Sequence, residues 1–241
     1  MTRAPAEQQK RLLDLQKLDT RLARIAHERR SLPVHARIAD LETKAAECER
    51  ERIETATRRS DSGRELARIE SDVEQIHTRA KRHHERLMGG ASAKEAQALE
   101  QELALLAGRT SELEDLELEQ MEVVEQLDAD LAAIKERAEA IVTASNEAIA
   151  EREKEFSRLD AEARSLGAER DALAGTLSAD LVALYDEIRE HTGGLGAIAI
   201  YGTRTEGVSI DFSLSEIHEI NSAGPDDVVT SEEHGYILVR L

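Results

Sequence analysis

Four residues near a Gly-Gly pair have side chains that could bind a metal ion, namely His77, His83, His84 and Glu85. His77 and His84 are seven residues apart, so they share one face if this stretch is a helix. A structural zinc ion needs four ligands in a tetrahedron, and one helix face cannot surround it without donors from a second helix. We therefore interpret these histidines as solvated surface residues rather than as metal ligands.

The same stretch is rich in basic side chains, although the whole chain has 50 acidic and 32 basic residues and a formal charge of −18. The basic residues nearest the glycine pair are Arg79, Lys81, Arg82, Arg86 and Lys94. They are either helix-surface charges paired with Glu, or a site for an anion or a partner. Because an acidic chain repels nucleic acid, a nucleic-acid contact would have to be local, and this stretch is where it is possible. These residues are our candidate partner-binding site.

No arrangement typical of an enzyme occurs in the sequence. It contains no HExxH zinc motif and no Ser-His-Asp spacing. Gly193-Gly194-Leu195-Gly196 is glycine-rich, but neither a Gly-Lys-Ser/Thr motif nor a helix follows it. It therefore predicts a helix end and a strand entry rather than a phosphate-binding loop. The sequence predicts a protein that is not an enzyme.

Two heptad runs flank the pair Gly89-Gly90. In each run, apolar residues recur in alternating steps of three and four, which is the a/d spacing of a coiled coil. The first run consists of Ile38, Leu41, Ala45 and Cys48, then Leu66, Ile69, Val73, Ile76, Ala80 and Leu87. The second run consists of Leu106, Leu113, Val124, Leu127, Leu131, Ile134, Ala138 and Ile141. Two long helices joined by a turn at residues 88–92 should form an antiparallel coiled-coil hairpin, with residue 91−k opposite residue 91+k.

The first run is interrupted by polar residues at the seam positions Arg52, Thr55, Arg59 and Ser62. These positions should face the region near Gln120. Two interpretations stay open: a loosened, partly hydrated middle of the hairpin, or a pair such as Arg59 with an acid that sets the register of the two helices.

Proline and capping residues predict the helix boundaries. Residues 5–30 form a first helix, which should break at 31–33 because proline disfavours helix at the residue before it. The second helix then runs from about Val34 to Leu87. Ser92 and Glu95 have the capping-box spacing, which places the start of the return helix directly after the glycines.

A change of composition predicts a small α+β module over residues 178–241, after a hairpin over residues 1–177. Ser178 can cap a short helix from Ala179 to His191. Ser213 has the capping-box spacing and should open another short helix. β-branched and aromatic residues predict four strands, at Ile198 to Tyr201, Val208 to Phe212, Val228 to Thr230 and Tyr236 to Arg240. The fold class is mostly α, a long helical hairpin with a small terminal module.

The composition fits an elongated helical protein. Charged residues make up 34% of the chain and aromatic residues 2%, which leaves too few large side chains for a broad core. The single cysteine, Cys48, falls at a seam position and is interpreted as a small buried apolar residue. The lack of a disulfide framework fits a reducing cytoplasm. The N-terminus has no apolar leader and no run of about 18 apolar residues occurs, so we expect a cytoplasmic protein without membrane association.

Four segments occur in order along the chain: RLLDLQKLDTRLARIAHERRSLP, ASAKEAQALEQEL, LSADLVALYDEIREHTGGLGA, and PDDVV followed by GYILVR. In these segments the chain resembles the actinobacterial members of a family of coiled-coil hairpin proteins with a C-terminal C4-type zinc ribbon. The resemblance implies a ribbon whose zinc ion is held by two CxxC pairs. The ligand positions it implies here are Thr205 and Val208, then Ser231 and His234.

None of these four positions holds cysteine. Val208 has no donor atom and neutral hydroxyls are poor zinc ligands, so His234 alone is a good donor. We therefore expect no cofactor and no bound zinc. In place of a metal, we predict a small apolar core braced against the helix from Ala179 to His191 and formed by Val208, Ile210, Phe212, Val229, Ile237 and Val239.

Two functional classes stay open. The first is a non-enzymatic adaptor or scaffold that recruits protein partners through the hairpin tip or the terminal module, with a homo-oligomer also compatible. The second is a nucleic-acid- or transcription-associated regulator acting through the module, which the resemblance implies because zinc ribbons often bind nucleic acid. From Leu195 to Leu241 the chain has two basic and eight acidic residues, a poor surface for phosphate. The charge therefore favours the first class.

Overall fold

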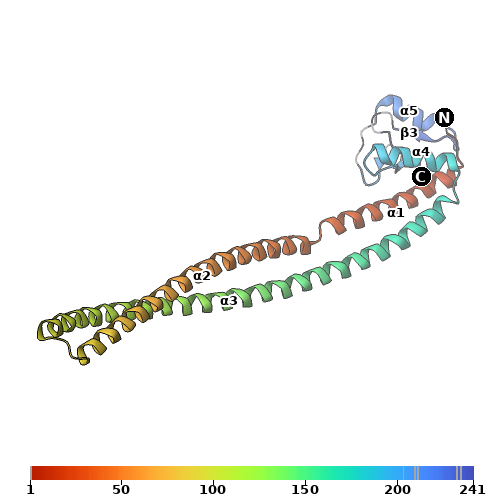
Figure 1. Ribbon diagram of the computed structural model, residues 1–241. Coiled ribbons are helices and arrows are strands. Elements are labelled where there is room, and N and C mark those ends of the chain that lie inside the picture. Colours follow the sequence, from red (N-terminus) through yellow and green to blue (C-terminus); the bar gives the residue numbers. More distant parts are fainter. Residues whose placement is uncertain (1, 203, 209, 211, 232, 234) are drawn as a thin grey trace. The chain divides into compact units, whose positions relative to one another are not determined.

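The computed structural model describes residues 2–202, 204–208, 210, 212–231, 233 and 235–241. Its helices are α1 (Ala6–Arg30), α2 (Pro33–Met88), α3 (Ala93–Ala174), α4 (Ala179–His191) and α5 (Leu214–Ser222) (Figure 1). Its strands are β1 (Ala197–Tyr201), β2 (Arg204–Thr205), β3 (Val229–Thr230) and β4 (Ile237–Arg240). The expectation of a mostly helical fold, with a long hairpin and a small terminal sheet, is confirmed.

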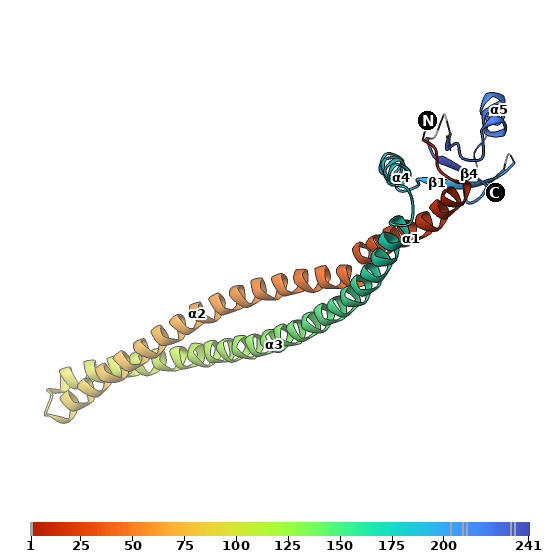
Figure 2. The ribbon, with the colours of Figure 1, turned by 90° about the vertical axis from the view of Figure 1, so that its right-hand side faces the viewer.

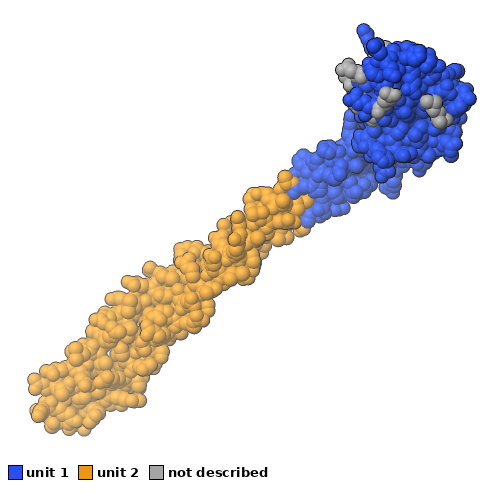
Figure 3. All heavy atoms as spheres, turned by 90° about the horizontal axis from the view of Figure 1, so that it is seen from above, with its two compact units in different colours: residues 1–35, 149–241 blue, residues 36–148 orange. Residues whose placement is uncertain are grey.

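The chain divides into two compact units, which Figure 3 distinguishes by colour. Unit 1 comprises residues 1–35 and 149–241, and unit 2 comprises residues 36–148. Unit 1 holds α1, the C-terminal part of α3, α4, α5 and the sheet, whereas unit 2 holds most of α2 and the N-terminal part of α3. The domains expected from the sequence, 1–177 and 178–241, stay a prediction.

The gap between α1 and α2 contains only Ser31 and Leu32. The hydroxyl and the backbone N–H of Ser31 both donate to the His27 carbonyl, at 2.9 Å and 3.0 Å. These bonds satisfy a carbonyl group that the end of α1 would otherwise leave unpaired. Pro33 is the first residue of α2, a position where its missing N–H is not needed.

In unit 2, α2 and α3 pack as an antiparallel coiled coil through the predicted seam. The buried seam residues include Cys48, Ile69, Val73, Leu113, Leu127 and Ile134. Arg86 lies 3.3 Å from Glu95 beside the turn, and farther along the Gln120 side chain donates to the Ser62 carbonyl at 3.2 Å. These pairs confirm the predicted register near the turn and in the middle of the hairpin.

In the polar stretch of the seam, an exposed ion pair joins α2 to α3. The Arg59 guanidinium donates to both carboxylate oxygens of Asp128, at 2.9 Å and 3.1 Å. These hydrogen bonds hold the pKa of Asp128 below its usual value. Arg59 does pair with an acid, but the side chains are 43% and 50% exposed, so water screens the pair and it fixes the register only weakly. Thr55, by contrast, is buried in the seam.

In unit 1, α1 runs beside the C-terminal part of α3 in both ribbon views (Figures 1 and 2). Arg21 pairs with Glu162 at 2.5 Å, and Arg11 donates to the Thr176 hydroxyl at 3.0 Å. These contacts agree with the predicted pairing of residue 91−k with residue 91+k, which sets residues 5–30 beside residues 152–177.

The terminal sheet of unit 1 has the strand order β2-β1-β4-β3. β1 is parallel to β4, and the two outer pairs are antiparallel. The N-terminal arm also joins this module, because the Ala4 N–H donates to the Asp226 carbonyl at 2.9 Å. Both chain ends are thus tied to one small structure.

Apolar side chains cover both faces of the sheet, which corrects the single core predicted from the sequence. On one face, Ile237 and Val239 pack with α1 and α4. On the other face a second cluster gathers around Ile198, Ile200, Ile210, Ile220, Val229 and Leu238, with Val208 and Phe212 against it. Successive residues of a strand point to opposite faces, so the predicted core residues divide between the two clusters.

The strand predicted at Val208 to Phe212 is wrong for its described residues. Val208, Ile210 and Phe212 lie outside the strands, while β2 occupies Arg204–Thr205. Their side chains nevertheless pack against the second cluster. The alternation therefore reflects the packing of these three side chains against the sheet, and none of the three belongs to a strand.

The two predicted caps of the short helices have different outcomes. At α5, Ser213 and Glu216 form the complete capping box, with hydrogen bonds of 2.9 Å and 3.1 Å. At α4, Ser178 occupies the cap position but its side chain makes no capping bond. The Ser178 backbone N–H instead donates to the Gln8 side chain at 3.1 Å, so α1 holds the start of α4.

Candidate functional site

The turn of the hairpin in unit 2 is built by glycine geometry. Gly90 has a φ of +96°, a conformation that side-chain-bearing residues rarely adopt. The Gly89 N–H donates to the Glu85 carbonyl at 3.0 Å and ends α2. The Ser92 hydroxyl accepts the Glu95 N–H at 3.4 Å, which fits the predicted start of the return helix.

The structure separates the five candidate basic residues into paired and unpaired groups. Arg79 lies 3.6 Å from Glu102, and Arg86 lies 3.3 Å from Glu95. Among the described residues, no ion pair or side-chain hydrogen bond involves Lys81, Arg82 or Lys94, and all three are exposed. Free positive charge therefore remains on both sides of the turn.

A shallow hollow of about 580 Å³ lies at the turn, lined by Arg82, Glu85, Arg86, Gly89, Gly90, Ala91 and Glu95. Next to the glycines, Met88 is 80% exposed. Flexible thioether side chains adapt to irregular partner surfaces, and Lys and Arg supply attraction for acids. The tip thus combines an apolar contact point with free cations.

The interpretation of the tip histidines is correct for His77 and His84, which are exposed. It is wrong for His83, whose side chain is only 17% exposed and lies 2.9 Å from a Glu102 oxygen. The Arg79 guanidinium lies 3.3 Å from the same Nε2 atom of His83 and 3.6 Å from Glu102, so the three side chains form one polar cluster. Because α2 turns His83 toward α3, it belongs to the packing between the helices.

The positions that the resemblance assigned to zinc have other partners. The Thr205 hydroxyl donates to the Val208 carbonyl, and the buried Ser231 hydroxyl donates to Glu216 at 3.4 Å. The fourth position, His234, lies outside the described residues. Two hydroxyls and an alkyl side chain do not fit a structural zinc ion, which prefers thiolate and imidazole donors. Within the described part of the chain, no three His, Cys, Asp or Glu side chains are grouped to hold a metal.

Arg240 of β4 acts as a clamp on the second face of the sheet. Its guanidinium donates to the carbonyls of Ala223 at 2.7 Å, Gly224 at 2.6 Å and Asp227 at 3.0 Å. It also reaches the Ile220 carbonyl at 3.4 Å. One planar cation therefore ties β4 to the end of α5 and to the turn after it.

A buried polar network in unit 1 was missed by the sequence reasoning. Asp19 of α1 is 4% exposed and accepts a hydrogen bond from the Tyr185 hydroxyl at 2.8 Å. Arg170 of α3 lies 3.3 Å from Asp19, and Arg189 of α4 lies 3.5 Å from it. Gln16 accepts the Gly196 N–H at 2.6 Å and so extends the network to the entry of β1.

Tyr185 is the centre of this junction. Burial, followed by its hydrogen bond to Asp19, raises the pKa of Tyr185 far above its usual value. A Cβ atom at Gly196 would lie 2.5 Å from the Tyr185 ring, so only glycine allows this close approach. One sequence signal was available: Gln16 and Asp19 share the buried side of α1 with Leu12 and Leu15.

Comparison with known proteins shows to which family this architecture belongs. The family model of the CT398-like coiled-coil hairpin domain matches residues 15–193, which include most of α1 and all of α2, α3 and α4. The chain belongs to the CT398-like coiled-coil hairpin family. An uncharacterised relative from Mycobacterium tuberculosis, Rv2229c, is 31% identical over 243 aligned residues, which cover 99% of this chain and 98% of the relative.

Solved structures agree with this family assignment. A protein from Mycobacterium smegmatis has a TM-score of 0.86 and 31% identity, with 99% of this chain and 100% of that chain covered. CT398 from Chlamydia trachomatis has a TM-score of 0.72 at 17% identity, covering 98% of each chain. HP0958 from Helicobacter pylori has a TM-score of 0.52 at 12% identity, also over 98% of each chain. The last two likenesses concern the fold alone.

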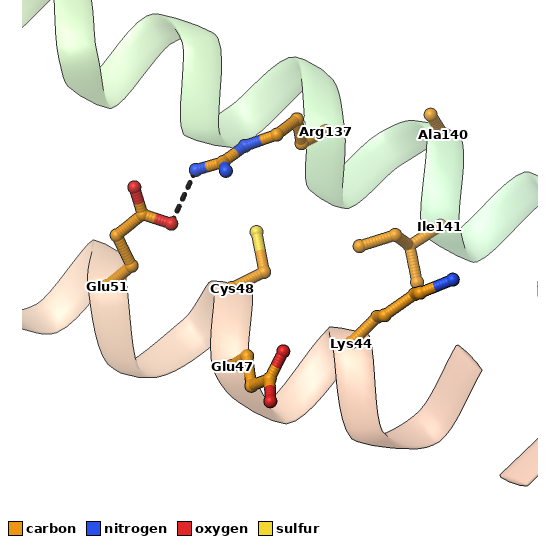
Figure 4. A pocket seen from close by; sticks show the side chains of 7 residues that line it. All are labelled: Lys44, Glu47, Cys48, Glu51, Arg137, Ala140 and Ile141. Atoms are coloured by element: carbon orange, nitrogen blue, oxygen red, sulfur yellow. Dashed lines mark hydrogen bonds and ion pairs between the residues drawn. The ribbon is translucent and has the colours of Figure 1, made fainter. Parts of the chain in front are cut away.

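In unit 2 of this family member, a cavity lies between α2 and α3. The cavity, of about 390 Å³, is lined by Lys44, Glu47, Cys48, Glu51, Arg137, Ala140 and Ile141 (Figure 4). The Cys48 thiol points between the helices and donates to the Ile134 carbonyl at 3.5 Å, while Glu51 and Arg137 pair at 2.5 Å. Cys48 is buried, in agreement with its interpretation as a small seam residue.

No helix in the described part of the chain is long and apolar enough to span a bilayer.

Proposed function

We propose that this protein is a non-enzymatic coiled-coil adaptor that recruits an acidic partner protein through its hairpin tip. One observation carries the proposal: Lys81, Arg82 and Lys94 are exposed and without an ion-pair partner among the described residues. Exposed cations in an acidic chain attract acidic surfaces and steer their approach. Met88, at the same turn, supplies the apolar contact that charge alone lacks.

A protein partner fits this tip better than nucleic acid does. Glu85 and Glu95 line the same hollow as Arg82 and Arg86, so the surface is mixed in charge. A continuous phosphate backbone favours a basic stripe without interspersed acids. The alternative of a nucleic-acid- or transcription-associated regulator is kept as an outcome of the experiment. The cytoplasm is the proposed compartment, on the evidence of a single cysteine and no disulfide framework.

We expect Lys81→Glu combined with Arg82→Glu to abolish partner capture without loss of helix content. Both side chains are exposed and unpaired in the described structure, so their reversal removes attraction without breaking an internal contact. Capture from native lysate, quantified by mass spectrometry, measures the first effect, and far-UV circular dichroism measures the second. Capture by the unmodified protein should also weaken as salt is raised.

The matched control is Arg24→Glu combined with Lys154→Glu, which makes the same change in net charge at exposed positions of unit 1. This control should retain the partners. Equal capture by the tip variant and the unmodified protein would contradict the proposal. Partners that disappear after nuclease treatment would instead favour the nucleic-acid alternative.

The proposal extends to the terminal module, which we interpret as a ribbon-like structure held without zinc. Its supports are the Thr205 bond to Val208, the Ser231 bond to Glu216, and the Arg240 clamp on four carbonyls. The apolar clusters on the two faces of the sheet add to these polar contacts.

Purified protein is therefore expected to contain no stoichiometric zinc, and a strong chelator should leave its melting temperature unchanged. Metal binding to a structural site would contribute folding free energy, so its removal would lower the melting temperature. Elemental analysis and thermal unfolding with and without chelator provide the measurements. One tightly bound zinc ion per chain would overturn this part of the proposal.

A further inference from the structure

The middle of α3 in unit 2 carries charge of only one sign. Residues 110–134 contain nine Asp and Glu residues and no Lys, Arg or His. Coiled-coil surfaces usually intersperse both signs, because acids three or four residues apart repel each other. Here no base within the segment offsets that repulsion.

Within this segment, six residues share one side of the helix. They are Glu114, Asp115, Leu118, Met121, Glu122 and Glu125, and all are exposed. Their spacing places them on roughly one third of the helix circumference, turned away from the seam with α2. We call these six residues the α3 face.

The centre of the α3 face is apolar. Leu118 is 60% exposed and Met121 is 48% exposed, one helical turn apart. The four surrounding carboxylates form no ion pair with any other described residue, whereas Asp128 farther along α3 is paired with Arg59. An apolar pair surrounded by unneutralised acids is therefore left without a partner within unit 2.

We infer that the α3 face binds a basic amphipathic helix of a partner protein. Such a helix would bury Leu118 and Met121 with its apolar side, while its flanking Lys and Arg neutralise the carboxylates. Because the four carboxylates of the α3 face are negative, they favour a partner helix that carries positive charge. The surface lies apart in sequence from the tip residues and would give the adaptor a second, oppositely charged contact.

A second copy of this chain fits the α3 face less well. Its own basic stretch, around Lys81 and Arg82, lies on α2, where Ile76, Ala80 and Leu87 are half-buried toward α3. That stretch therefore offers positive charge but no apolar side to cover Leu118 and Met121. A partner helix that carries both features matches the face better.

The test uses the full chain and a synthetic helical peptide with Leu residues along one side and Lys residues on both flanks. Fluorescence anisotropy should show salt-dependent binding. Leu118→Ser combined with Met121→Ser should weaken it about tenfold or more, because the buried apolar area is lost. Glu122→Lys combined with Glu125→Lys should weaken it by a similar factor. All four positions are exposed, so helix content should not change.

The matched control is Leu116→Ser combined with Val123→Ser, which removes two exposed apolar residues from another side of the same helix segment. This variant and the tip variant Lys81→Glu, Arg82→Glu should bind the peptide as the unmodified protein does, so the outcome is separate from that of the tip proposal. Equal losses in the control and in the α3-face variant would overturn the inference. A scrambled Lys/Leu peptide that binds equally well would overturn it too, as would a dimer in sedimentation that the α3-face variants abolish.

Discussion

Replacement of Ile134 by Asp is expected to destabilise unit 2 by about 3–5 kcal/mol. Ile134 is 2% exposed in the seam between α2 and α3, and its carbonyl accepts the Cys48 thiol. A carboxylate at this position would lose its water without gaining a cation, and the apolar contacts of the isoleucine would be lost as well. Urea unfolding followed by far-UV circular dichroism measures the change.

The control for this variant is Val142→Asp, eight residues beyond the seam residue Ile134 and on an exposed side of α3, where Val142 is 58% exposed. The same carboxylate there stays hydrated, so the unfolding free energy should change by less than about 1 kcal/mol. Similar losses in the two variants would mean that the seam does not run where the structure places it.

The hairpin was predictable because its information is local and repeated. Each heptad restates which side of the helix is buried, so single polar interruptions such as Thr55 and Arg59 do not change the result. Gly89 and Gly90 interrupt the pattern once, and that one position determines which residues of α2 and α3 lie opposite each other. The break after Arg30 was predictable for a different reason, the backbone chemistry of Pro33.

The terminal module was harder to predict because its order depends on contacts between distant residues. The run Ala197–Tyr201 is apolar on both sides, since α1 and α4 cover one face of the sheet and α5 lies over the other. An alternating pattern cannot show which elements cover each face. For the same reason, Val208 and Ile210 were predicted as a strand although they only pack against one.

At the tip, the sequence located the basic residues but not their partners. Arg86 and Glu95 are nine residues apart across the turn, and Arg79 meets Glu102 on the return helix. Rotamers and the exact approach of two helices decide such pairs, and spacing along one helix does not contain that information. Only the three-dimensional structure distinguishes these paired residues from Lys81, which has no ion-pair partner among the described residues.

The second large effect is expected for Asp19→Ala in unit 1, a loss of about 3–5 kcal/mol of unfolding free energy. Asp19 faces Arg170, Arg189 and the Tyr185 hydroxyl, which come from α3 and α4. Removing Asp19 alone should destabilise unit 1 more than replacing all of its charged partners with apolar residues would. The two arginines would stay partly buried and would keep their desolvation penalty without the carboxylate that offsets it. The junction of α1 with α3 and α4 should therefore weaken as a whole.

Asp186→Ala is the control, because Asp186 also pairs with Arg170 but its side chain is 37% exposed. Water can replace that carboxylate, so the loss should be about 1 kcal/mol or less. Urea unfolding gives the free energies, and hydrogen exchange of the β1 and β4 amides reports on unit 1 itself. Asp19→Asn keeps the shape of the side chain and an acceptor for Tyr185 but removes the charge, so its loss of unfolding free energy should lie between those of the two alanine variants.

If Asp19→Ala costs no more unfolding free energy than Asp186→Ala, then Arg170 and Arg189 can be satisfied without Asp19. In that case the polar network would form when α1, α3 and α4 pack together but would not stabilise their packing.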